Sequence, residues 1–319
     1  MENEISKRGK IIREMVYEFN HNRKLVEHFV EESRCVSEMD KAFNYPSYIK
    51  TRRISLDNFE MELISREPLD KEQNEEQTAK MVILQLHGGG YVNAFKNNYR
   101  TMAGLYSEAG DGADVLTIDY RVAPANPYPA AFEDAVAAYD WLLENGYCEN
   151  EIILAGDSAG GGLAMALCHY LKDEGRKLPA GIVAMSPWTD LLATGASYKE
   201  NYDIDPVFGQ NGSSLIYHNP YIGENDATNP YISPMYGDFT DFPPMLIQVG
   251  TCEMLLSDSE SVAQKAKRAG VKVRFSVYEG MFHVFQMAAK LMPESKQAWA
   301  EVNGFMKAIM KKQIQEEDS

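Results

Sequence analysis

The 319-residue chain contains 47 acidic and 31 basic side chains, which gives a formal net charge of −16. This acidity excludes the basic face that nucleic-acid binding requires, and it disfavours docking on an anionic membrane. No run of about 18 apolar residues occurs, so we expect no transmembrane helix, and the N-terminus lacks the apolar core of a signal peptide. The four cysteines have no paired or metal-like spacing, which is typical of free thiols in a reducing compartment, so we expect a cytoplasmic protein.

Helical periodicity marks the N-terminal region. Apolar residues recur at helical spacing within residues 5–34, which predicts helical structure there. Two strand-like runs follow at 49–56 and 60–66, and they predict an antiparallel start to a sheet. The charged stretch 70–80 is typical of an exposed turn.

From residue 81 onward, strand and helix patterns alternate. The predicted elements are strand 81–86, helix 97–109, strand 113–119, helix 131–144, strand 151–155, helix 159–173 and strand 181–185. Further strands are predicted at 245–249 and 271–278, before a final helix at 293–312. This alternation predicts an α/β fold with a mostly parallel sheet and helices on both faces. An aromatic-rich segment, 195–227, interrupts the rhythm.

A candidate nucleophile lies where the strand 151–155 meets the helix 159–173. The chain there reads Gly156-Asp157-Ser158-Ala159-Gly160, a Gly-x-Ser-x-Gly run between an apolar stretch and a helix-like segment. A sharp turn of this kind forces the serine into a strained conformation, and the flanking glycines keep side chains out of the bend. The pattern predicts that Ser158 is exposed to a general base as a nucleophile.

A glycine run follows the strand 81–86, in the order His87-Gly88-Gly89-Gly90. Consecutive glycines leave backbone N–H groups uncovered, so an oxyanion can approach them. A flexible turn is the alternative for an isolated triple glycine, but the elbow downstream favours an oxyanion hole. We expect the donors to be Gly88, Gly89 and Ala159.

The candidate acid, Glu253, lies just past the strand 245–249, at the carboxyl edge where open α/β sheets place their sites. A solvated loop carboxylate is the structural alternative for this residue. Asp258 is a rival candidate for the acid, although its position in the sequence favours a role at the beginning of the next helix. Glu279 is also near, but it precedes the turn that presents the candidate histidine.

The candidate base, His283, follows the strand 271–278 and reaches the same edge of the sheet. The order Ser158, Glu253, His283 is the chain order of an α/β-hydrolase triad. His87 opens the glycine run, and we expect it to shape that loop rather than transfer protons.

Together these motifs resemble the hormone-sensitive-lipase-like branch of the α/β-hydrolases, whose members are mainly bacterial carboxylesterases. The resemblance covers roughly residues 80–290 and rests on His87-Gly88-Gly89-Gly90-Tyr91, Asp119-Tyr120-Arg121-Val122-Ala123-Pro124, Tyr128-Pro129-Ala130, Gly156-Asp157-Ser158-Ala159-Gly160-Gly161, and Ser233-Pro234 before Pro243-Pro244. The chain departs from the family pattern at Ala125, where Glu is usual, and at Ala94, where Gly is frequent. The acid is Glu253 where many members have Asp.

The resemblance implies an α/β-hydrolase fold with a helical cap. We expect N-terminal cap helices in 1–48, a first part of the catalytic core in 49–194, a cap insertion in 195–227 and the rest of the core in 228–319. Four residues are candidates for substrate contact: Tyr91, Asp157, Phe208 and Tyr217.

The implied activity is hydrolysis of small-molecule esters by a serine carboxylesterase. We expect acyl groups from acetyl to about hexanoyl, because cap residues should close one end of the pocket. Such chemistry needs no metal and no organic cofactor. Hydrolysis of amides or lactones is an alternative on the same fold and triad. So is a non-catalytic binding protein, because the plant gibberellin receptors resemble this branch and have lost the catalytic histidine. Family members often dimerise through the last strand and helix, so a homodimer is a further expectation.

Overall fold

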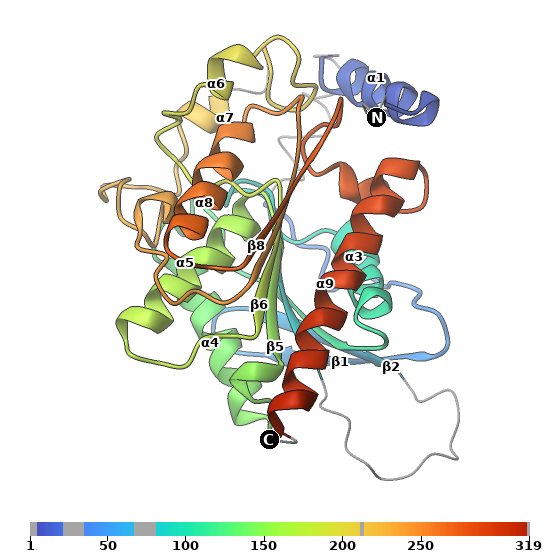
Figure 1. The fold of residues 1–319 in the computed structure, drawn as a ribbon, viewed down its shortest axis with the longest axis vertical. Helices are drawn as coiled ribbons and strands as arrows, with labels where there is room; N and C mark the ends of the chain where they lie inside the picture. Colours follow the sequence, from blue (N-terminus) through green and yellow to red (C-terminus); the bar gives the residue numbers. More distant parts are fainter. Residues whose placement is uncertain (1–4, 22–34, 67–80, 211–213, 318–319) are drawn as a thin grey trace.

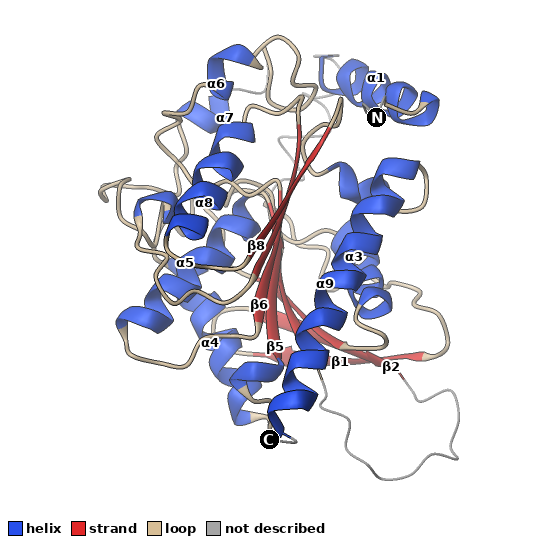
Figure 2. Cartoon of the chain, viewed as in Figure 1, coloured by secondary structure: helices blue, strands red, loops and turns tan. Residues whose placement is uncertain are grey.

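A single eight-stranded sheet organises the chain, with strand order β1-β2-β4-β3-β5-β6-β7-β8 (Figures 1 and 2). The structure is a computed structural model that describes residues 5–21, 35–66, 81–210 and 214–317. The strands are β1 Ile49–Ser55, β2 Glu60–Arg66, β3 Val82–Leu86, β4 Asp114–Asp119, β5 Ile152–Asp157, β6 Gly181–Met185, β7 Met245–Gly250 and β8 Val273–Tyr278.

The sheet is antiparallel at one edge and parallel elsewhere. Strand β2 pairs antiparallel with both β1 and β4, while β4, β3, β5, β6, β7 and β8 pair in parallel. Strands β3, β5, β6 and β7 are buried along their whole length, as expected for parallel strands covered on both faces. The predicted antiparallel start and the predicted mostly parallel sheet are therefore confirmed.

Five long helices cover the two faces of the sheet. They are α3 Asn97–Ala109, α4 Ala130–Glu144, α5 Ala159–Asp173, α8 Leu256–Arg268 and α9 Pro293–Glu317. Helices α4, α5 and α8 pack in one apolar core with one face of the sheet, and α3 and α9 pack in a second core on the other face (Figure 2). The final helix, predicted at 293–312, continues to Glu317 in the structure.

Helix α1 Lys7–His21 and the segment 195–227 lie over the same end of the sheet (Figure 1). The described residues of that segment, 195–210 and 214–227, contain two short helices, α6 Ser197–Glu200 and α7 Ser214–Tyr217. The rest of the predicted N-terminal helical region and the predicted turn at 70–80 lie outside the described residues. Within the described residues, no helix has the length and apolar character needed to span a bilayer.

All four cysteines are free thiols, as the sequence predicted. Cys168 and Cys252 are buried, whereas Cys35 and Cys148 are exposed.

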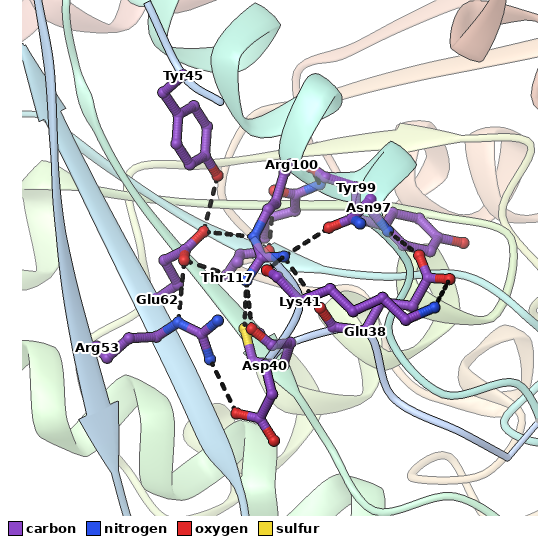
Figure 3. Close-up of polar contacts among 12 residues, drawn as sticks. Glu38, Asp40, Lys41, Tyr45, Arg53, Glu62, Asn97, Tyr99, Arg100 and Thr117 are labelled. Carbon is purple, nitrogen blue, oxygen red and sulfur yellow. Dashed lines mark hydrogen bonds and ion pairs between the residues drawn. The ribbon is translucent and has the colours of Figure 1, made fainter. Parts of the chain in front are cut away.

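A buried arginine, Arg100 on α3, fastens the segment before β1 to the core (Figure 3). Its side chain is 1% exposed and forms two hydrogen bonds to the carboxylate of Glu62, Nε to Oε1 at 2.8 Å and Nη2 to Oε2 at 3.2 Å. The same guanidinium donates to the backbone carbonyls of Glu38, Met39 and Lys41. A buried charge is costly unless it is paired and hydrogen-bonded, and Arg100 meets both conditions.

We expect Arg100→Met to lower the free energy of unfolding by about 3–5 kcal/mol, because it leaves the Glu62 carboxylate buried without its main partner. Arg53→Met is the matched control. Arg53 contacts the same carboxylate at 3.1 Å, but its side chain is 36% exposed, so a loss within about 1 kcal/mol is expected. Urea denaturation of both variants tests this difference, and equal losses would contradict it.

Candidate active site

Ser158 occupies a strained turn between β5 and α5. Its φ of 51° and ψ of −123° lie outside the regions that L-residues favour, at a cost of about 1–3 kcal/mol. Two backbone hydrogen bonds hold the residue against the end of β6: its N–H donates to Met185 O, and its carbonyl accepts from Trp188 N–H, both at 2.9 Å. The turn predicted around this serine is therefore present.

Glycines make the turn possible because three chain segments approach each other closely. A Cβ atom at Gly160 would lie 2.0 Å from the carbonyl oxygen of Leu86, and one at Gly156 would lie 2.3 Å from the carbonyl of Gly160. Separations under 3.0 Å to backbone atoms cannot be relieved by a side-chain rotation. The first turn of α5 is thus pressed directly against the end of β3.

Glu253 and His283 form a buried pair at the carboxyl edge of the sheet. His283 Nδ1 lies 3.0 Å from Glu253 Oε2. Glu253 is 0% exposed, and its Oε1 accepts from the Gly250 N–H at 2.6 Å and from the Ser186 hydroxyl at 2.8 Å. Glu253 is therefore no solvated loop carboxylate, and its contact leaves Nε2 of His283 as the ring nitrogen that can take a proton.

The two rival carboxylates lie elsewhere. Asp258 is in the first turn of α8, and its Oδ2 accepts from the N–H groups of Thr189 and Asp190 at 2.8 and 2.9 Å. It is not the cap of that helix, because Leu255 occupies the cap position. Burial raises the pKa of Asp258 to about 8. Glu279 is exposed and its nearest hydrogen bond is with Thr251 Oγ1 at 3.4 Å.

The glycine loop after β3 has its carbonyl groups fixed by hydrogen bonds. Gly88 O lies 2.7 Å from His87 Nδ1, Gly89 O accepts from the two N–H groups of the following turn, and Gly90 O accepts from Asn219 Nδ2 at 2.8 Å. Gly89 and Gly90 have φ of 112° and 64°, which a side chain would disfavour. Among the described residues, no acceptor contacts the N–H of either glycine. These two N–H groups are therefore available to an anion.

Gly88 differs from the other two glycines, because its N–H donates to Asp157 Oδ1 at 3.2 Å. The sequence predicted Gly88 and Gly89 as oxyanion donors together with Ala159. An N–H already directed at a carboxylate is not free for substrate, so the geometry favours Gly90 in place of Gly88. Asp157 was predicted as a substrate contact, but it is 2% exposed and lies behind the loop. Burial raises the pKa of Asp157 to about 7, against the opposing effect of a protonated His283.

His87 has the environment of a loop-shaping residue. It is fully buried, and its ring stacks on Tyr120 with centroids 4.0 Å apart. Burial lowers the pKa of His87 to about 4, so the imidazole is neutral at pH 7. A neutral ring that donates from Nδ1 to the Gly88 carbonyl fixes the peptide that carries the Gly89 N–H.

The three other candidates for substrate contact have different surroundings. Phe208 is half-buried and its ring centroid lies 4.6 Å from that of His283. Tyr91 is 1% exposed and stacks on Tyr221 at 3.9 Å, which favours a packing role. Tyr217 is 46% exposed, and its hydroxyl contacts the Tyr198 carbonyl at 3.4 Å.

Ser186, which follows β6 at the same edge as Glu253, was not among the residues predicted from the sequence. Its hydroxyl donates to Glu253 Oε1 and accepts from the N–H of Val284, the residue after His283. The rule that located Glu253, a polar residue just past a buried strand, would also have found it. Within the parts of the chain that the structure describes, no cluster of three or more His, Cys, Asp or Glu side chains could hold a metal.

Comparisons with known proteins show what this chain is similar to. A family model described as alpha/beta hydrolase fold matches residues 83–287. An "Acetyl-hydrolase" of Streptomyces hygroscopicus is 39% identical over 225 residues, which are 70% of this chain and 75% of that protein. An "Esterase" of Acinetobacter venetianus is 35% identical over 233 residues, 73% of this chain and 76% of that protein.

Solved structures are similar over nearly the whole chain. A crystal structure of the protein EstE5 has a TM-score of 0.81 at 33% identity, covering 96% of this chain and 99% of that one. A crystal structure of an esterase from the bacterial hormone-sensitive lipase family has a TM-score of 0.79 at 35% identity, with the same coverage. The chain belongs to the α/β-hydrolases, in the hormone-sensitive-lipase-like branch, and its enzyme class is carboxylic ester hydrolase.

We expect Gly160→Ala to destabilise the fold by about 3 kcal/mol or more and to abolish esterase activity, because the added methyl meets the carbonyls of Leu86 and His87. Gly104→Ala is the control, since a Cβ there has nothing within 4 Å and lies inside α3. That variant is expected to gain about 0.5–1 kcal/mol. Thermal unfolding of both measures the contrast, and a stable, active Gly160→Ala protein would refute the tight-turn account.

Proposed function

We propose that this protein is a serine carboxylesterase that works through an acyl-enzyme. The observation that carries the proposal is the buried Glu253–His283 pair, at 3.0 Å, on the sheet edge where the strained Ser158 turn also lies. His283 takes the proton of Ser158 as the hydroxyl attacks the ester carbonyl. Glu253 fixes the tautomer of His283 and favours its protonated form.

The N–H groups of Gly89 and Ala159, joined by that of Gly90, receive the developing oxyanion charge in this proposal. Donors fixed before the reaction stabilise the transition state without reorganisation, and losing one typically costs about 10²–10³ in rate. His283 then protonates the departing alcohol and activates water to release the acid. Neither metal nor organic cofactor takes part in these steps.

Short acyl groups, from acetyl to about hexanoyl, are the proposed substrates. The name of the Streptomyces hygroscopicus relative, acetyl-hydrolase, supports a small acyl group. Phe208 of the segment 195–227 lies against His283, and its ring would close one end of a pocket. The boundaries of the cap pieces, 1–48 and 195–227, remain part of this proposal.

We also propose two properties of the whole protein, its oligomeric state and its location. Strand β8 is the last strand of the sheet, so its free edge suits the expected homodimer. The four free thiols favour a cytoplasmic location.

We expect Ser158→Ala and His283→Ala each to lower kcat for p-nitrophenyl butyrate by roughly 10⁶-fold while the fold persists. A serine-directed fluorophosphonate should label the wild type and not Ser158→Ala. His218→Ala, at an exposed histidine of the insertion, should retain full activity. A folded Ser158→Ala protein with near-wild-type turnover would exclude the mechanism, and an unlabelled, inactive wild type would favour the binding-protein alternative.

Acyl preference is measured with p-nitrophenyl acetate, butyrate, octanoate and dodecanoate. We expect kcat/KM to be highest for the two shorter esters and to fall toward dodecanoate, because the pocket end limits chain length. A higher kcat/KM for dodecanoate than for butyrate would overturn the short-acyl assignment. Parallel assays with anilides and lactones of matched acyl length separate esterase activity from the amide and lactone alternatives.

A further inference from the structure

Two buried side chains of the segment 195–227 hold the loop that carries the acid. Asn201 Nδ2 donates to the carbonyl of Thr251 at 3.0 Å and to that of Glu253 at 2.7 Å. Asp205 Oδ2 accepts from the N–H of Met254 at 2.6 Å. The backbone on both sides of the Glu253 side chain is therefore fixed by this segment.

Asp205 also fixes the turn that carries Phe208. Its Oδ1 accepts from the N–H groups of Val207 at 2.7 Å and Phe208 at 3.0 Å. Asp205 is 0% exposed, so each of its oxygens is satisfied by backbone N–H groups in place of water. One carboxylate thus joins the acid loop to the turn that places an aromatic ring on the base.

The ring of Phe208 lies against the imidazole of His283, with centroids 4.6 Å apart and planes inclined at 57°. A ring in this position limits the orientation of the imidazole and keeps water from one side of it. Because Glu253 holds Nδ1 of the same imidazole, the acid and the ring restrain His283 together. Asp205 accepts hydrogen bonds from both segments, from the N–H of Met254 next to the acid and from the N–H of Phe208.

Three carboxylates interact electrostatically with His283. Glu253 accepts its hydrogen bond, Asp157 comes from the end of β5, and Asp205 comes from the insertion. Burial raises the pKa of Asp205 above its ordinary value, while its hydrogen bonds and a protonated His283 oppose that rise. On the outer side, Arg13 of α1 donates to the Gly280 carbonyl and to the Cys252 sulfur, so a cation also lies near this loop.

We propose that Asp205 is a positioning residue of the triad, which locks the Glu253 loop and the Phe208 ring into one rigid unit around His283. This inference rests on the serine-esterase function proposed above. A misplacement of about 1 Å in a catalytic group can cost about 10²-fold in rate, so a residue that never touches substrate can limit turnover.

The test compares Asp205→Asn with Asp203→Asn. Both remove one negative charge from the same segment, but Asp203 is exposed and Asp205 is buried. An asparagine at 205 keeps the shape, yet its amide group must face an N–H that the carboxylate accepted, so at least one contact is lost. The kinetics are measured with p-nitrophenyl butyrate across pH, per active site titrated with fluorophosphonate, which removes any effect of misfolded protein.

We expect Asp205→Asn to lower kcat about 10- to 100-fold with KM changed less than about threefold. The acid limb of kcat/KM should also move to lower pH, because a lost negative charge makes the protonated imidazole less favourable. Asp203→Asn should match the wild type in both. Wild-type kcat and pH profile per titrated site in Asp205→Asn would overturn the proposal and leave only a structural role.

Phe208→Leu keeps the test decisive if Asp205→Asn does not fold. It should lower kcat without moving the acid limb, because the charge at 205 remains, and an unchanged kcat would overturn the proposal. Failure of the proposed function is distinguishable, since it would appear as an inactive wild type that the fluorophosphonate does not label. Failure of this inference alone leaves a labelled and active wild type.

Discussion

The close backbone contact at the start of α5 is the constraint on which the site depends. Cβ atoms at Gly160 and Gly162 would lie 2.0 and 2.1 Å from the carbonyl oxygens of Leu86 and Trp188, so this helix touches the end of β3 and the loop after β6 without side chains between. Ser158, at the start of this helix, has a positive φ of 51°. The proposed nucleophile and the proposed oxyanion donors therefore depend on one packing arrangement.

Buried carboxylates then fix the loops around this contact. Asp157 accepts from Gly88 N–H, Glu253 from Gly250 N–H, Asp205 from Met254 N–H and Asp258 from two N–H groups after β6. Burial removes water from each carboxylate, and hydrogen bonds from backbone N–H groups replace part of that hydration. These donors are oriented by the chain and cannot rotate away. A site built on such contacts is pre-organised, because its dipoles are in place before substrate arrives.

The segment 195–227 contributes side chains to this framework. Asn219 holds the carbonyl of Gly90 in the glycine loop, Asn201 and Asp205 hold the loop of Glu253, and Phe208 lies on His283. The insertion thus contacts both the proposed oxyanion donors and the acid–base pair. At the opposite side, the Arg100 network fastens the chain before β1 to α3 and β2, which gives the N-terminal segment a rigid base.

The sequence alone determined the alternation of strands and helices, the turn at Ser158 and the order of Ser158, Glu253 and His283, because these depend on local periodicity and on short runs of glycine. Only the tertiary structure decided which neighbours act on them. Ser186 contacts Glu253 across 67 residues and Asn219 contacts Gly90 across 129. The choice of Gly90 over Gly88 likewise depends on Asp157, a carboxylate from another strand. No local pattern encodes such partners, since a buried hydrogen bond depends on which groups the fold brings together.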